Sequence, residues 1–147
     1  MALSPGTAGR ALVALQFALI GLGAVLVVPA RWAAASTALA LAGAALGAWA
    51  LAANRLGNFN IHPEPRRGGV LVTAGPYRWI RHPMYAALLL AMAGLATAST
   101  GAGWAAWAAL AAVLAAKARL EERGLDAVHP GWAAYRARTA AIVPFLF

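Results

Sequence analysis

The sequence predicts an all-α membrane protein in which four transmembrane helices cross the bilayer and both chain ends lie on one side. Two features of the composition indicate this class: 63% of the 147 residues are hydrophobic and only 11% are charged. Soluble domains carry about 25% charged and about 45–50% apolar residues. A third feature is that the few charges separate long uncharged stretches. The length suits a single domain covering residues 1–147.

The uncharged stretches define the expected spans. A helix needs about 20 apolar residues to cross the hydrocarbon core, with about 17 as the lower limit. The uncharged run from His82 to Ala116 is too long for one span, and the turn-forming residues Ser99–Gly103 divide it. Pro83 suits the first turn of a helix. We therefore expect spans at residues 11–30, 32–54, 83–98 and 104–118, and the last two are short enough to need tilt or local thinning of the bilayer.

The basic residues predict the orientation of these spans. With the N-terminus in the cytoplasm, eleven of the twelve Lys and Arg residues lie inside and only Arg31 lies outside, as the positive-inside rule requires. The inside residues are Arg10, Arg55, Arg66, Arg67, Arg78, Arg81, Lys117, Arg119, Arg123, Arg136 and Arg138. We therefore expect an N-in, C-in topology in a bacterial-type inner membrane. The loop between spans two and three and the C-terminal segment are then cytoplasmic.

The first stretch raises the alternative of a cleaved signal peptide, since Arg10 precedes an apolar run that ends in Val28-Pro29-Ala30. The apolar run is longer than the roughly 7–15 residues of the apolar core of a signal peptide. We therefore expect it to be a retained span.

The composition also excludes several classes of site. Without cysteine there is no disulfide, thiolate nucleophile or cysteine-ligated metal. The three histidines, His62, His82 and His129, lack metal-ligand spacing, so no metal is expected. The net charge of +8 comes from bases beside the membrane, which suit anionic lipids. No segment is long enough to form a basic nucleic-acid-binding module, so no nucleic acid is expected as a partner.

Small residues indicate how the spans pack. Gly43 and Gly47 form a GxxxG pair in the second span, and such pairs let helix backbones approach closely. A general bias toward alanine and glycine explains the pair equally well.

The first polar cluster lies in a connection that is longer than a scaffold needs, from Leu56 to Tyr85. Its polar and turn-forming residues gather before and at the start of the third span: Gly75, Tyr77, Arg78, Arg81, His82 and Tyr85. A helix N-terminus carries unpaired N–H groups and a partial positive charge, so this place favours an anion such as a carboxylate.

The second polar cluster is Glu121-Glu122, expected just beyond the fourth helix. Because spans three and four form a hairpin, these acids return close to Arg81 and His82. An alternative is an ordinary solvated helix face, since Lys117 is four residues before Glu121 and Arg119 is three before Glu122. The tryptophans beside the two clusters, Trp79 and Trp132, are membrane-interface anchors or pocket-lining residues.

These residues occur in an order that resembles a known superfamily. The matching set is LVTAGPYRWIRHPMY, then Glu121-Glu122, then Trp132-x-x-Tyr135 and Pro144. It resembles the isoprenylcysteine carboxyl methyltransferase and phospholipid methyltransferase superfamily of integral membrane enzymes. The resemblance extends from Leu56 to Pro144, and the ordered set is far more specific than any one of its parts.

The resemblance implies S-adenosylmethionine as cofactor and S-adenosylhomocysteine as product. It implies catalytic roles for Arg81 and Glu121. The residues that it implies in cofactor binding are Leu71, Val72, Gly75, Tyr77, His82, Pro83, Tyr85, Glu121 and Glu122. The cofactor's own groups fit this set, because an Arg/His pair suits its carboxylate and paired glutamates suit its ammonium or ribose hydroxyls.

The expected function is methyl transfer at the cytoplasmic interface to a lipophilic or small acceptor, with isoprenylcysteine-type carboxylate O-methylation as the leading reaction. Phospholipid or amine N-methylation and thiol S-methylation are alternatives within the superfamily. A non-catalytic membrane scaffold subunit is an alternative from another class. A proton-coupled exporter is disfavoured, because the spans carry no acid within the membrane.

Overall fold

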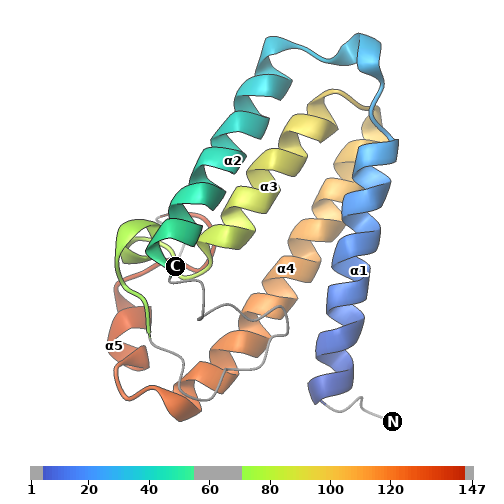
Figure 1. Cartoon of the computed structure of the whole chain (residues 1–147). Coiled ribbons are helices and arrows are strands. Elements are labelled where there is room, and N and C mark those ends of the chain that lie inside the picture. The colour runs from blue at the N-terminus through green and yellow to red at the C-terminus, as the bar shows by residue number, and fades with distance from the viewer. Residues whose placement is uncertain (1–4, 55–70, 145–147) are drawn as a thin grey trace.

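The computed structural model describes residues 5–54 and 71–144, and the elements in these ranges are helical apart from one isolated parallel bridge. They are α1 (Pro5–Val25), η1 (Pro29–Arg31), α2 (Ala34–Ala53), η3 (Gly75–Arg78), α3 (Pro83–Thr97), α4 (Gly101–Val128) and α5 (Trp132–Ala137). The four long helices lie side by side in the order α2, α3, α4, α1 (Figure 1). By length and composition, α1, α2 and α4 can each cross a membrane, and α3 is a shorter apolar helix.

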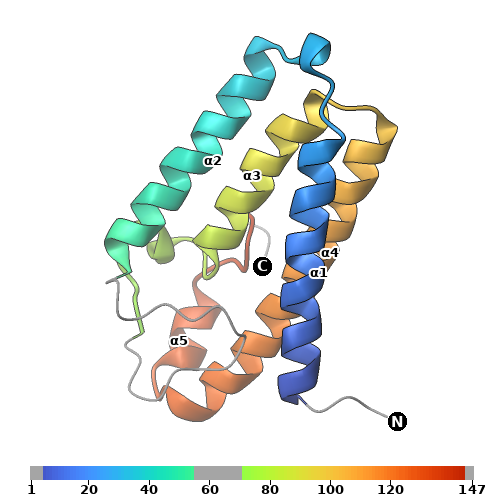
Figure 2. The same cartoon turned by 45° about the vertical axis from the view of Figure 1, so that its right-hand side comes forward.

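The helices place two groups of connections at opposite ends of the bundle. The start of α1, the end of α2, the start of α3, the end of α4 and α5 lie at one end (Figure 2). The other end holds η1 and the α3–α4 turn. There the Arg31 guanidinium donates to the Ser99 carbonyl over 3.2 Å, and the Val28 N–H donates to the Ala98 carbonyl over 2.9 Å.

The first helix differs from the predicted span at 11–30. It begins at Pro5, since proline is favoured in the first turn, and it ends at Val25. Val28 is extended, with φ −102° and ψ 108°, because the residue before a proline disfavours the helical region. The second helix differs from the predicted 32–54 by only one or two residues at each end.

The fourth helix extends beyond the predicted span of 104–118 at both ends. It begins at Gly101, so the turn is confined to the residues around Ala98–Thr100, and it continues to Val128. The prediction gave the bounds of the membrane span, and the charged residues that end a span do not end a helix. The helix stops before His129-Pro130, where proline prevents continuation. Its 28 residues extend about 42 Å, well beyond the hydrocarbon core.

The pairing of α2 with α3 depends on small residues. A Cβ on Gly43 would lie 2.5 Å from the Ala91 nitrogen and 2.7 Å from the Ala87 oxygen, so the two backbones are in direct contact. Where α2 begins and α3 ends, Ser36 and Thr97 share a hydrogen bond of 2.8 Å. The close approach predicted from the GxxxG pair is therefore confirmed at Gly43.

Candidate functional site

The start of α3 and the acidic pair of α4 meet at one end of the bundle. Arg81 Nε donates to Glu122 Oε1 over 2.8 Å, and these side chains are only 8% and 12% exposed. The predicted return of the acids to the Arg-His pair is confirmed. Their position on α4 corrects the expectation that they follow the helix, because Glu121 and Glu122 lie within it and more than one turn before its end. The negative C-terminal end of a helix dipole is unfavourable for acids, but it acts only over the last turn and so does not reach this pair.

His82 lies between the two carboxylates. Its Nδ1 is 3.4 Å from Glu121 Oε2, and its Nε2 is 3.1 Å from Glu122 Oε1. Only the protonated imidazolium donates from both nitrogens, so this geometry suits the cationic ring. Burial lowers the pKa of His82, but hydrogen bonds to both acids and their negative charges outweigh burial and raise the pKa above its ordinary value.

Tyr85 extends the network along the first turn of α3. Its hydroxyl donates to Glu121 Oε1, and its ring stacks on His82 with centroids 5.3 Å apart and planes inclined by 6°. Pro83, the first residue of α3, is fully buried. The anion predicted at this helix N-terminus is thus supplied, in the structure, by the chain's own Glu121 and Glu122.

Arg81 has a second set of partners that the sequence did not indicate. Its Nη1 donates to the Arg136 carbonyl over 3.2 Å and also to the Thr139 carbonyl. The backbone joins the same segments, because Arg81 N–H donates to the Ala140 carbonyl over 2.8 Å and Ile80 forms a parallel bridge with Ala140. The chain after α5 is therefore fastened to the entrance of α3.

Gly75 and Tyr77 lie in η3, between the end of α2 and α5. Gly75 has φ +58°, and a Cβ there would lie 2.8 Å from Ala53 Cβ, so both conformation and space require glycine. The Tyr77 carbonyl accepts a hydrogen bond of 2.7 Å from the Tyr135 hydroxyl. Burial raises the pKa of Tyr77, opposed by a hydrogen bond with Asn54. Burial likewise raises the pKa of Tyr135 to about 12.

The remaining residues implied in cofactor binding, Leu71 and Val72, precede η3 in the chain. Both are half-buried in the irregular segment that leads to η3. In the described ranges, no hydrogen bond or ion pair joins Leu71, Val72, Gly75 or Tyr77 to the acidic pair. Most of the expected cytoplasmic loop, residues 55–70, lies outside the described residues.

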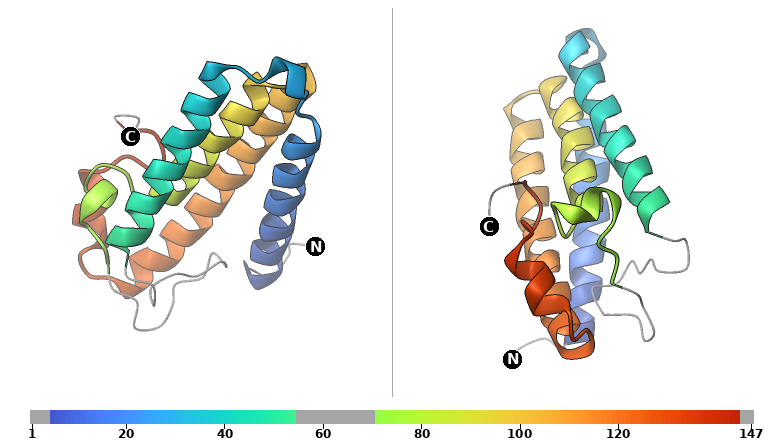
Figure 3. Two further views of the ribbon diagram at one scale, coloured as in Figure 1. Left: turned by 45° about the horizontal axis from the view of Figure 1, so that its top comes forward. Right: turned by 90° about the vertical axis from the view of Figure 1, so that its left-hand side faces the viewer.

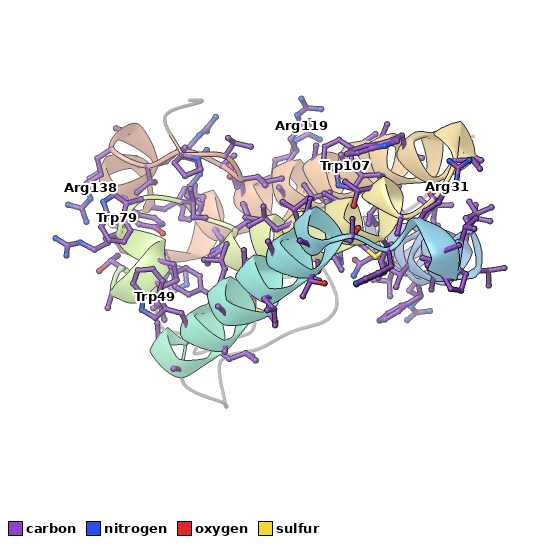
Figure 4. All side chains as sticks on the ribbon, turned by 90° about the horizontal axis from the view of Figure 1, so that it is seen from above. Arg31, Trp49, Trp79, Trp107, Arg119 and Arg138 are labelled. Atoms are coloured by element: carbon purple, nitrogen blue, oxygen red, sulfur yellow. The ribbon has the colours of Figure 1, made fainter. Side chains whose placement is uncertain are left out.

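The two tryptophans singled out in the sequence differ in environment. Trp79 is 47% exposed and meets Trp49 of α2 edge to face, with centroids 5.8 Å apart (Figure 4). Trp132 is 2% exposed, and its indole N–H is buried without a hydrogen-bond partner among the described residues. Trp79 therefore suits an interface anchor, whereas Trp132 packs inside the protein.

The alternative of a solvated helix face fails for Lys117. Lys117 is 3% exposed, and its Nζ donates to Gln16 Oε1 of α1 over 2.6 Å. Arg119 is exposed and points away from the bundle (Figure 4). The described ion pairs of the two glutamates are instead with Arg81, His82 and, at 3.8 Å, Arg136.

The site retains capacity to bind a polar ligand. Each carboxylate has one oxygen in a tight contact, while Glu121 Oε2 and Glu122 Oε2 have partners only at 3.4 and 3.8 Å. A carboxylate oxygen accepts two hydrogen bonds, so both acids can accept from an ammonium or from hydroxyls. Within the described ranges, His, Cys, Asp and Glu form no group of three that could hold a metal ion.

The chain is similar in sequence to known proteins. A family model described as phospholipid methyltransferase matches residues 9–129. The chain is also 36% identical over 83 residues to the cobalt-zinc-cadmium resistance protein CzcN of Cupriavidus metallidurans. That match covers 55% of this chain and 38% of the relative's length. No solved structure matches the chain.

Proposed function

Because the chain belongs to the phospholipid methyltransferase family, we propose that it is a methyltransferase that binds S-adenosylmethionine between the start of α3 and the acids of α4. The observation that carries the proposal is the network in which Arg81, His82 and Tyr85 meet Glu121 and Glu122. Arg81 and His82 contact Glu122, which follows them in the chain by 41 and 40 residues, so two distant segments converge there.

The polar side chains of this network fit the cofactor's polar groups. Glu121 Oε2 and Glu122 Oε2, which are only loosely engaged, accept hydrogen bonds from an ammonium or from ribose hydroxyls. Arg81 and His82 orient both acids, and the same cations suit a carboxylate. The cofactor supplies a methyl group on a cationic sulfonium. Orienting two reactants can lower the free-energy barrier by on the order of 7–11 kcal/mol. Positioning is therefore the main task of these residues.

The acceptor that we propose is a lipophilic acid, methylated on its carboxylate in the manner of isoprenylcysteine. A carboxylate needs no general base, whereas a protonated amine must first lose a proton. Phospholipid amines and thiols are the competing acceptors. We further propose that α3 crosses the membrane together with α1, α2 and α4, and that the site faces the cytoplasm, where S-adenosylmethionine is available.

The proposal is tested by calorimetric titration of the detergent-purified protein with S-adenosylhomocysteine. We expect saturable one-to-one binding. The variant Glu121→Gln/Glu122→Gln should lose at least about a hundredfold in affinity, because each charge-assisted hydrogen bond contributes about 1.5–3 kcal/mol and every 1.4 kcal/mol is tenfold. Arg119→Gln is the matched control, since it removes an exposed charge from the same helix.

Gel filtration and circular dichroism establish that each variant is folded, because breaking a buried ion pair costs about 3–5 kcal/mol. Unchanged affinity in the folded double variant contradicts this site. Absence of binding to the folded wild type contradicts the methyltransferase proposal and favours a scaffold subunit. Methyl transfer from labelled cofactor to an isoprenoid thioether acid, phosphatidylethanolamine and small thiols then identifies the acceptor class.

A further inference from the structure

Lys117 is a buried basic residue that the network of Arg81, His82 and the two glutamates does not use. It lies on α4 one helical turn before Glu121, about 6 Å closer to the middle of the bundle. Its Nζ donates to Gln16 Oε1 over 2.6 Å and lies 5.2 Å from the centre of the Tyr85 ring. Three helices, α1, α3 and α4, thus surround one ammonium group.

Both contacts of Lys117 suit a charged ammonium. An amide carbonyl accepts from it, and an aromatic face attracts a cation. Neither partner is an anion, and the part of the chain that the structure describes contains no ion pair of Lys117. Glu121, one turn away, directs its oxygens to Tyr85 and His82. The ammonium is therefore held in place without a direct counter-ion.

The neighbouring network already supplies enough positive charge for its two acids. Arg81 and protonated His82 match Glu121 and Glu122, and Arg136 adds a further ion pair with Glu122 at 3.8 Å, so Lys117 is an excess positive charge. A buried charge without a counter-ion is costly, and an ionisable residue in an apolar helix is retained mainly for function. Lysines on apolar surfaces usually extend their ammonium to water, but Lys117 is 3% exposed.

We propose that Lys117, oriented by Gln16, binds the anionic group, a carboxylate or a phosphate, of an amphiphilic methyl acceptor. This inference rests on the proposed function. The ammonium lies on the bilayer side of the acidic pair, so an acceptor with its chain among the lipids brings its anionic group to Lys117 beside the cofactor site. The acceptor class is thus an anionic amphiphile, and neutral or purely cationic acceptors are disfavoured.

The competing role for Lys117 is that of a general base, which requires the neutral amine. The contacts with Gln16 Oε1 and the Tyr85 face favour the cation instead. Arginine keeps the charge and cannot act as a base at ordinary pH, so Lys117→Arg separates the two roles. Lys117→Met removes the charge and keeps most of the side-chain volume.

The test measures binding of three matched amphiphiles by calorimetry in a neutral detergent at pH 8.5. Dodecanoate carries a carboxylate, dodecyl phosphate carries a phosphate, and dodecanamide is neutral. We expect the wild type to prefer at least one anion over the amide by about tenfold or more. The preferred anion distinguishes a carboxylate acceptor from a phosphate headgroup. Lys117→Met should lose the preference, and Lys117→Arg should keep it.

Arg119→Met is the control, because it removes an exposed cation two residues away and should keep the preference. The inference is overturned if the wild type binds the amide as tightly as both anions. It is equally overturned if Lys117→Met retains the preference or Lys117→Arg loses it. Titration of the same samples with S-adenosylhomocysteine separates the two proposals, since failure of cofactor binding alone contradicts the function and leaves the anion site in place.

Discussion

His82 is the residue on which the geometry of the candidate site depends most. It occupies the N-cap position of α3 and places one ring nitrogen toward each of two carboxylates, at 3.4 and 3.1 Å. Its backbone N–H donates to the Ala141 carbonyl over 2.9 Å, so the same residue also joins the C-terminal segment. A charged imidazolium stabilises this arrangement, whereas a neutral ring donates to only one acid.

The protonation of His82 predicts how stability depends on pH. Because its folded pKa lies above its ordinary value of about 6.5, its ion pairs stabilise the fold fully below about pH 6.5. That contribution is lost as the pH rises through the folded pKa. Without ligand, His82→Gln should therefore unfold several degrees below the wild type at pH 6, and the gap should narrow by pH 9.

The measurement is the apparent Tm of both proteins across this pH range in one detergent. About 1 kcal/mol corresponds to about 2–4 °C for a chain of this size. A gap that stays constant or widens from pH 6 to pH 9 contradicts a stabilising imidazolium.

The α2–α3 pair is the element that sets the position of the site's entrance. Direct backbone contact at Gly43 fixes how closely the two helices approach, while Gly75 brings η3 against the end of α2. The start of α3, with Arg81 and His82 before it, is thereby held beside α2 and η3. Steric fit between small residues thus governs the placement of a polar site.

The two glycines of the GxxxG pair differ in a testable way. A Cβ on Gly43 would lie 2.5 Å from a backbone nitrogen, but one on Gly47 would lie 3.6 Å from Ala87 Cβ, an ordinary contact. Gly43→Ala should destabilise the protein by about 1–3 kcal/mol through overpacking. Gly47→Ala should be neutral or stabilising, since alanine favours a helix over glycine by about 1 kcal/mol.

Thermal unfolding of both variants in detergent measures the difference. Each substitution adds the same methyl group to the same helix, so Gly47→Ala controls for propensity. Equal stability of the two variants would contradict the backbone contact at Gly43.

At the scale of the whole molecule, the polar site occupies one end of an apolar bundle. Figure 3 shows α5 and η3 gathered beside the ends of α2 and α4, away from the α3–α4 turn. The proposed topology places that site end in the cytoplasm and the turn at Thr100 on the other side of the membrane. Arg138, exposed after α5, then lies inside.

The absence of cysteine from the sequence makes this topology directly testable. In spheroplasts, a membrane-impermeant maleimide should label Thr100→Cys and leave Arg138→Cys unlabelled. Permeabilised membranes should show labelling of both variants, which controls for reactivity. The reverse pattern in spheroplasts would contradict the N-in, C-in orientation.

The sequence by itself determined the helical membrane class, the apolar segments, the start of α3 at Pro83 and the convergence of Arg81–His82 with Glu121–Glu122. Each depends on local signals: uncharged length, a proline and a hairpin that returns the chain. Only the tertiary structure decided that Glu121 and Glu122 lie within α4, because a helix can continue beyond the part that spans the membrane. It also decided that the C-terminal segment is fastened to Arg81 and that Lys117 is buried against Gln16. These contacts join residues 55 and 101 positions apart, and no local pattern specifies which distant side chain fills a given space.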